Sequence, residues 1–199
     1  MSSRDAVLAS IRTNLPRVDL PLPAVPLFDD KPPASLLDAF KESLHIMGGL
    51  FLDTPVSGDA LAPVRDKIAG AKVVCSTVPE IRGNRDIAAI HAARELADVD
   101  VAIVRASFAV AETGSVLLSD ADLKVNAVAY LAQHLIVLLD PADIVMNLHH
   151  AYRRAEFRNT HYAAFHSGPS ATADIEGVLI HGAQGVRSLS VLPLVRRAV

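Results

Sequence analysis

The chain has 199 residues, of which 51% are hydrophobic and 21% are charged, and its formal net charge is −3. This length and apolar content predict one main domain with a substantial core, while the slightly acidic balance gives no basis for binding nucleic acid or an anionic membrane. The longest apolar run, near residues 135–139, is too short to span a bilayer, and the N-terminus lacks the apolar core of a signal peptide.

The first predicted element is an amphipathic helix over residues 3–15, which Ser2 or Ser3 can cap. Residues 16–33 hold six of the twelve prolines, so they predict a stiff, extended linker. A short helix cannot bury its own apolar face, and we expect this one to dock on the body or on another subunit. The apolar face consists of Val7, Leu8, Ile11 and Leu15.

From residue 34 onward, helical and strand-like segments alternate. This order favours an α/β fold with a mainly parallel sheet flanked by helices. The chain therefore divides into an arm over residues 1–33 and an α/β domain over residues 34–199. Helices are expected at residues 35–47, 59–70, 86–96 and 142–157, and strands at residues 50–52, 72–75, 100–104, 116–118, 135–139, 162–165 and 190–194.

Cys75 is the only cysteine. A single thiol excludes an intramolecular disulfide and a cluster held by this chain alone, because iron–sulfur clusters need several thiolates. Its apolar neighbours predict a buried, inert thiol in a strand, and this cysteine usage favours the cytoplasm. No pair of histidines has a recognised zinc spacing, so we expect no metal site and no intrinsic cofactor.

A carboxylate, a hydroxyl and a glycine lie together at Glu112, Thr113 and Gly114, between two apolar runs. A buried carboxylate is costly unless it is paired, so a glutamate in this position is expected to face a cleft or a partner. The alternative is that Glu112 only caps nearby backbone N–H groups.

A second polar segment follows the last but one predicted strand. Gly168, Pro169 and Ser170 form a turn, and residues 172–180 have helix-forming character. A turn that leads into a helix leaves backbone N–H groups that favour an anion, and the hydroxyls of Ser170 and Thr172 can add to such a site.

Two side chains next to this turn are further candidates for binding. His166 directly precedes it and has a suitable pKa for a general acid or base, although its ring could equally bind a loop carbonyl. Asp174 would lie in the first turn of the predicted helix, where a carboxylate offsets the helix dipole or positions the loop.

Together these segments resemble the LUD-domain family, and most closely its lactate utilisation protein C branch. The resemblance rests on Glu112-Thr113-Gly114 and on Ser167-Gly168-Pro169-Ser170 followed by Thr172-Ala173-Asp174-Ile175-Glu176, with support from His134 and from the pair Gly182 and Gly185. Ala171 stands where members usually have an arginine, which removes a bidentate anion donor. Ala132, Gln184 and Val186 also depart from the family pattern.

The resemblance implies a sheet related to the NagB, ribose-phosphate isomerase and CoA-transferase group. It also implies a part in the oxidation of L-lactate to pyruvate, in systems whose iron–sulfur clusters lie in partner proteins. We therefore expect a cluster-free subunit or accessory protein that works with iron–sulfur oxidoreductase subunits. It would bind a small anionic organic ligand near Glu112 and Ser170, in one cleft at the carboxyl ends of the strands.

Two alternatives remain open. The first is a CoA-transferase-like enzyme in which Glu112 attacks an acyl-CoA and forms an acyl-glutamate. The second is a non-catalytic ligand sensor. Whether the chain is an enzyme, and whether it forms a homo-oligomer, is left open by the sequence.

Overall fold

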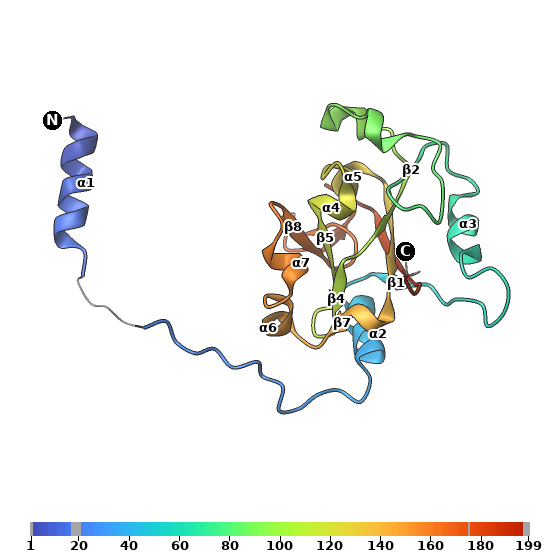
Figure 1. Cartoon of the computed structure of the whole chain (residues 1–199). Coiled ribbons are helices and arrows are strands. Elements are labelled where there is room, and N and C mark those ends of the chain that lie inside the picture. The colour runs from blue at the N-terminus through green and yellow to red at the C-terminus, as the bar shows by residue number, and fades with distance from the viewer. Residues whose placement is uncertain (1, 17–20, 175, 197–199) are drawn as a thin grey trace.

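The computed structural model describes residues 2–16, 21–174 and 176–196, and its body contains two main β-sheets (Figure 1). The larger sheet has five parallel strands in the order β1-β11-β6-β3-β2. This confirms the predicted α/β class with a mainly parallel sheet. Its strands are β1 (Leu50–Phe51), β2 (Val74–Ser76), β3 (Val101–Arg105), β6 (His134–Leu139) and β11 (Ser188–Pro193).

The smaller sheet has four strands in the order β7-β4-β5-β8 and was not predicted as a separate layer. Strands β4 and β5 form an antiparallel hairpin, β8 pairs antiparallel with β5, and the short β7 pairs parallel with β4. The turn of this hairpin contains Glu112. The strands are β4 (Phe108–Val110), β5 (Ser115–Ser119), β7 (Ile144–Val145) and β8 (Ala163–His166).

The largest part of the core lies between the two sheets. Side chains alternate along β4 and β5, so that Ala109, Val116 and Leu118 face this central core, while Phe108 and Leu117 face the outer side of the small sheet. Helix α2 (Leu36–Ile46) adds Phe40 and Leu44 to the central core. The remaining helices of the body are α3 (Ala62–Ile68), α4 (Asp120–Leu123), α5 (Val128–Leu131), α6 (Leu148–Ala151) and α7 (Ala155–Arg158).

Cys75 lies in β2 and is buried, as predicted. Burial raises the pKa of its thiol above the usual value, which keeps the sulfur protonated and inert.

Two predicted helices are wrong, because each of these segments forms shorter pieces instead of one helix. Residues 86–96 form the 3₁₀ turns Ile87–Ala89 and Ala93–Leu96, although Asp86 does accept a hydrogen bond from the N–H of Ala88 as a cap. Residues 142–157 are divided by β7, which pairs with β4, and then by Asn147, which caps α6. In residues 142–157, pairing with a distant strand overrides the local helix propensity.

The helix predicted over residues 172–180 is also wrong. Strand β9 (Ala171–Thr172) pairs antiparallel with β10 (Ile180–His181), and Glu176 and Gly177 between them have φ values of 52° and 71°. Such left-handed residues cannot continue a right-handed helix. Ile175, within the same segment, lies outside the described residues.

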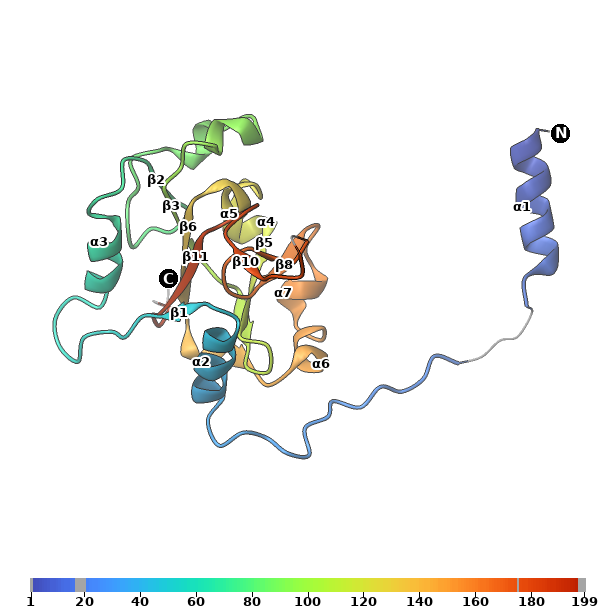
Figure 2. The ribbon, with the colours of Figure 1, turned by 180° about the vertical axis from the view of Figure 1, so that it is seen from behind.

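The N-terminal arm begins with α1 (Ser3–Asn14), which confirms the predicted helix. Ser2 caps it in a reciprocal capping box with Asp5. The helix stands away from the body in both views and buries no residue, so it does not dock on its own body here (Figures 1 and 2). No helix in the described ranges combines the length and apolar character needed to cross a membrane.

The linker between α1 and the body is anchored near its C-terminal end. The side-chain amide of Asn147 donates a 2.7 Å hydrogen bond to the carbonyl oxygen of Leu27, and Arg153 donates to that of Val25 at 3.3 Å. The ring of Phe28 lies 4.7 Å from that of His149, centroid to centroid. The arm therefore leaves the body alongside α6.

Candidate functional site

Two glycine turns, far apart in the chain, pack against the C-terminal end of α2. Gly114 follows Glu112 and Thr113 in the β4–β5 turn, and a Cβ on it would lie 2.2 Å from the backbone nitrogen of Leu44. Gly168 follows β8, and a Cβ on it would lie 2.0 Å from the carbonyl oxygen of Met47. Both glycines have positive φ, at 61° and 72°. Only glycine fits such a conformation at such close approach.

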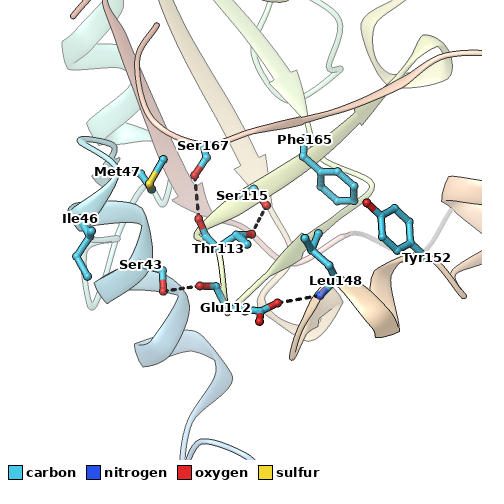
Figure 3. Close-up of a pocket in the computed structure, with 10 residues that line it drawn as sticks. All are labelled: Ser43, Ile46, Met47, Glu112, Thr113, Ser115, Leu148, Tyr152, Phe165 and Ser167. Atoms are coloured by element: carbon cyan, nitrogen blue, oxygen red, sulfur yellow. Dashed lines mark hydrogen bonds between the residues drawn. The ribbon is translucent and has the colours of Figure 1, made fainter. Parts of the chain in front are cut away.

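Hydrogen bonds join the two turns to each other and to α2 (Figure 3). The hydroxyl of Ser167 donates to the carbonyl oxygen of Thr113 at 2.8 Å, and that of Ser43 donates to the carbonyl oxygen of Glu112 at 3.3 Å. The hydroxyls of Thr113 and Ser115 are 2.5 Å apart and share one hydrogen bond. The turn that carries Glu112 is therefore held on both sides.

These turns surround an open cavity of about 480 Å³. It lies between α2, the β4–β5 turn, α6 and the end of β8, and none of its lining residues comes from the five-stranded sheet. The predicted cleft at the carboxyl ends of the parallel strands is therefore not where Glu112 lies. The cavity is lined by Ser43, Ile46, Met47, Glu112, Thr113, Ser115, Leu148, Tyr152, Phe165 and Ser167 (Figure 3).

The carboxylate of Glu112 is exposed at this cavity and also caps a helix. One of its oxygens accepts a 3.2 Å hydrogen bond from the N–H of Leu148, the first residue of α6. Glu112 therefore lines a cavity and also satisfies a backbone donor, but Ser170, which was expected in the same cleft, does not line this cavity. Within the described part of the chain, it forms no salt bridge and its second oxygen accepts no hydrogen bond.

The polar groups of the cavity offer more acceptors than donors. The hydroxyl protons of Ser43 and Ser167 are already donated to backbone carbonyls, whereas the Thr113–Ser115 pair uses one of its two protons. The second oxygen of Glu112 is a charged acceptor. A ligand that presents a hydroxyl proton to Glu112 and an acceptor to the Thr113–Ser115 pair would satisfy these groups.

The walls of the cavity are apolar and partly rigid. Phe165 stacks on Phe157 at a centroid distance of 5.8 Å and meets Tyr152 edge-on at 6.3 Å. Ile46 and Met47 lie at the end of α2, where they remain exposed. The cavity can therefore accept an apolar group beside its polar floor.

His166 lies on the other side of β8 and does not line the cavity. Its ring packs 5.2 Å from that of Tyr130, whose hydroxyl is hydrogen-bonded to that of Tyr162. The Nε2 atom of His166 is buried and has no hydrogen-bond partner among the described residues, and burial lowers the pKa of the ring to about 4. The same burial raises the pKa of Tyr130 to about 12. At neutral pH the imidazole is therefore uncharged.

The rest of the predicted anion-binding turn also lies outside the cavity. The N–H of Ser170 donates to the carbonyl oxygen of Val186 at 2.9 Å, so it is not free for an anion. Thr172 and Asp174 bond to each other at 3.0 Å rather than at a helix start. Pro169 lies beside Gly48. The structure thus brings Glu112 and Thr113 together with Ser167, and it places the residues from Pro169 to Asp174 elsewhere.

Several lining residues could not be found from the sequence. Ser43 and Met47 come from α2, where only Gly48-Gly49 hints at a closely packed helix end. Leu148 and Tyr152 lie in a segment that was predicted as one long helix, so nothing in the sequence indicated that they line a site. No group of three or more histidine, cysteine, aspartate or glutamate side chains that could hold a metal occurs in the described ranges.

Comparisons with known proteins agree with this architecture. The family model described as LUD domain matches residues 59–192. A DUF162 family protein from Deinococcus radiodurans, known from a crystal structure, aligns over 78% of this chain and 94% of its own with a TM-score of 0.58 and 16% identity. At that identity the match shows a common fold. Among curated proteins, no sequence matches significantly.

Proposed function

Because this chain belongs to the LUD-domain family, we propose that it acts in organic-acid metabolism by binding a small anionic organic ligand in the cavity beside Glu112. The family is associated with lactate utilisation. The observation that carries the proposal is the convergence of Glu112, Thr113 and Ser167 on one cavity.

A 2-hydroxy acid carries groups that complement this cavity. Its hydroxyl can donate to the free oxygen of Glu112, and its carboxylate can accept the remaining proton of the Thr113–Ser115 pair. No lysine or arginine is among the described residues that line the cavity, so the charge of the acid is not offset there. We therefore expect acids with a larger apolar substituent, which can pack on Phe165, to bind more tightly than L-lactate.

We further propose a cytoplasmic, cluster-free component of the lactate utilisation protein C type. Its partners would be iron–sulfur oxidoreductase subunits of a lactate-oxidising system. The support is that Cys75, the only cysteine, is buried in β2 and cannot supply the several thiolates of a cluster. The test is whether the tagged chain, expressed with its neighbouring genes, purifies with proteins that contain iron. A chain that purifies alone under those conditions would exclude the subunit role.

Calorimetric titration of the full chain tests the binding site. L-lactate, pyruvate and 3-phenyllactate are titrated into the wild type and the Glu112→Gln variant, with Glu176→Gln as a control for loss of a surface carboxylate. We expect Glu112→Gln to raise the Kd of the hydroxy acids by about tenfold, since one charge-assisted hydrogen bond is lost. Equal affinities in all three proteins would place the ligand elsewhere.

One observation favours the CoA-transferase-like alternative. The carboxylate of Glu112 lies at a largely apolar cavity that could hold an acyl group, and one of its oxygens accepts no hydrogen bond from the described residues. In that reaction the carboxylate forms a bond to the thioester carbonyl carbon, and the CoA thiolate leaves. Mass spectrometry after addition of acetyl-CoA and hydroxylamine would detect a modified Glu112. Ligand binding without any adduct would favour a role of the chain as a sensor or as a subunit.

A further inference from the structure

Helix α1 presents an apolar stripe to solvent. The side chains of Val7, Ile11 and Leu15 are 56%, 53% and 55% exposed. They lie on one face of the helix, so together they can pack against a hydrophobic surface. Arg4 lies on the same side of the helix, one turn before Leu8, and Arg12 flanks the stripe. In the part of the chain that the structure describes, neither arginine lies within salt-bridge distance of a carboxylate.

The rim of the Glu112 cavity has complementary properties. Ile46, Met47 and Tyr152 stand around its opening and are 74%, 48% and 51% exposed. Glu112 contributes a carboxylate without a cationic partner in the described part of the chain. The rim thus combines apolar side chains with the negative charge of Glu112, whereas α1 combines apolar side chains with the positive charges of Arg4 and Arg12.

We infer that α1 of a second copy of this chain lies across the rim of the Glu112 cavity. The stripe of Val7, Ile11 and Leu15 covers Ile46, Met47 and Tyr152, and an arginine of α1 reaches Glu112. Each copy has both an arm and a rim, and a reciprocal exchange of arms closes the assembly as a two-fold symmetric dimer.

The path of the linker favours docking of α1 on the rim of a second copy rather than on the rim of its own chain. The linker is held beside α6 by the hydrogen bonds from Asn147 to Leu27 and from Arg153 to Val25. From this anchor the described linker runs outward, away from the body (Figures 1 and 2). Pro21, Pro23 and Pro26 stiffen this stretch in an extended form, which opposes a return of α1 to its own rim.

The arm of the partner copy would also cover the ligand cavity. Thr113 and Ser115 form the floor, whereas Ile46, Met47 and Tyr152 form the rim, so a helix on the rim leaves the floor free and separates it from bulk water. The dimer itself does not depend on which ligand binds. Loss of the dimer and loss of ligand binding can therefore be measured separately.

Sedimentation velocity of the full chain over a range of concentrations tests the dimer. The stripe variant Ile11→Glu is compared with Ala6→Glu, which adds the same charge to the opposite side of α1. The rim variant Met47→Glu is compared with Val56→Glu, which changes an exposed residue of another loop. We expect Ile11→Glu and Met47→Glu to raise the dimer dissociation constant by about tenfold or more, because each would place a carboxylate against apolar side chains. Both controls should behave as the wild type.

Disulfide trapping identifies which α1 occupies the rim. Leu15→Cys and Ile46→Cys proteins with different tags are mixed and oxidised, and the wild type, whose Cys75 is buried, is the control. A mixed disulfide between the two tagged chains supports the exchange. A wild-type chain that stays monomeric at all concentrations overturns the inference. So does a Leu15→Cys/Ile46→Cys chain that forms its disulfide only within itself.

Discussion

The hydroxyl of Ser167 donates a 2.8 Å hydrogen bond to the carbonyl oxygen of Thr113, across a sequence separation of 54 residues. This bond joins the two motifs that the sequence singles out, and it does so where both turns pack on the end of α2. This contact, together with the two flanking strands, fixes the turn that carries Glu112. Three of the segments that form the candidate site therefore meet here, and its geometry should be sensitive to changes at each of them.

Gly168→Ala should destabilise the protein strongly. The added Cβ would lie 2.0 Å from the carbonyl oxygen of Met47, at a φ of 72° that L-residues avoid. We expect a loss of about 2–4 kcal/mol in the free energy of unfolding, measured by urea denaturation. Gly177→Ala is the matched control, because Gly177 has a φ of 71° with nothing within 4 Å of the added atom. Equal losses in both variants would show that strain alone, and not the contact with α2, requires Gly168.

Ser167→Ala should have a smaller effect on stability and a larger one on the site. Loss of its hydrogen bond to Thr113 should cost about 0.5–1.5 kcal/mol in the free energy of unfolding. Because the two turns are then joined less firmly, ligand affinity at Glu112 should also fall. Ser57→Ala, in an exposed loop, is the control for removal of a hydroxyl. A variant with unchanged stability and unchanged affinity would show that this bond has no structural role.

His166 should make the protein less stable in mild acid. Burial lowers the pKa of its ring from the ordinary 6.5 to about 4, so the unfolded chain takes up a proton at a higher pH than the folded protein does. The stability that the neutral His166 ring contributes is thus fully present above about pH 6.5 and is lost as the pH falls through about 4. Denaturation curves at several pH values should show a shallower decline for His166→Leu than for the wild type. His91→Leu, at an exposed position, should decline like the wild type.

Asp140→Ala should loosen the C-terminal segment. The Asp140 carboxylate accepts hydrogen bonds from the backbone N–H of Arg196 at 2.7 Å and of Ala142 at 3.0 Å, and the bond from Arg196 is the main reason that its pKa is lowered. We expect a loss of about 1–3 kcal/mol in the free energy of unfolding at pH 7. The difference from the wild type should shrink in acid, as Asp140 becomes protonated. Asp66→Ala, at an exposed position of α3, is the control. A difference that is the same at all pH values would exclude a charged Asp140 as the cause.

Local sequence determined the parts of this protein in which nearby residues act together. The periodic apolar residues of α1 and the continuous apolar runs of β3 and β6 predicted those elements, because an apolar helix face and a fully buried strand each have a clear sequence pattern. The same reasoning placed Glu112 in a turn between two strands and Cys75 in the core. The family resemblance, which rested on the Glu112 and Ser167 motifs, is shown by the LUD-domain match.

Only the tertiary structure decided which motif residues meet. The segment from Thr172 to Ile180 has helix propensity, yet pairing of β9 with β10 and the left-handed turn at Glu176 and Gly177 override it. Because that helix does not form, the anion site predicted at Ser170 does not form either. The cavity instead takes its walls from α2, α6 and β8, whose residues carry no local mark of a site. Their convergence depends on contacts between distant segments, such as Gly168 on Met47, which no local pattern encodes.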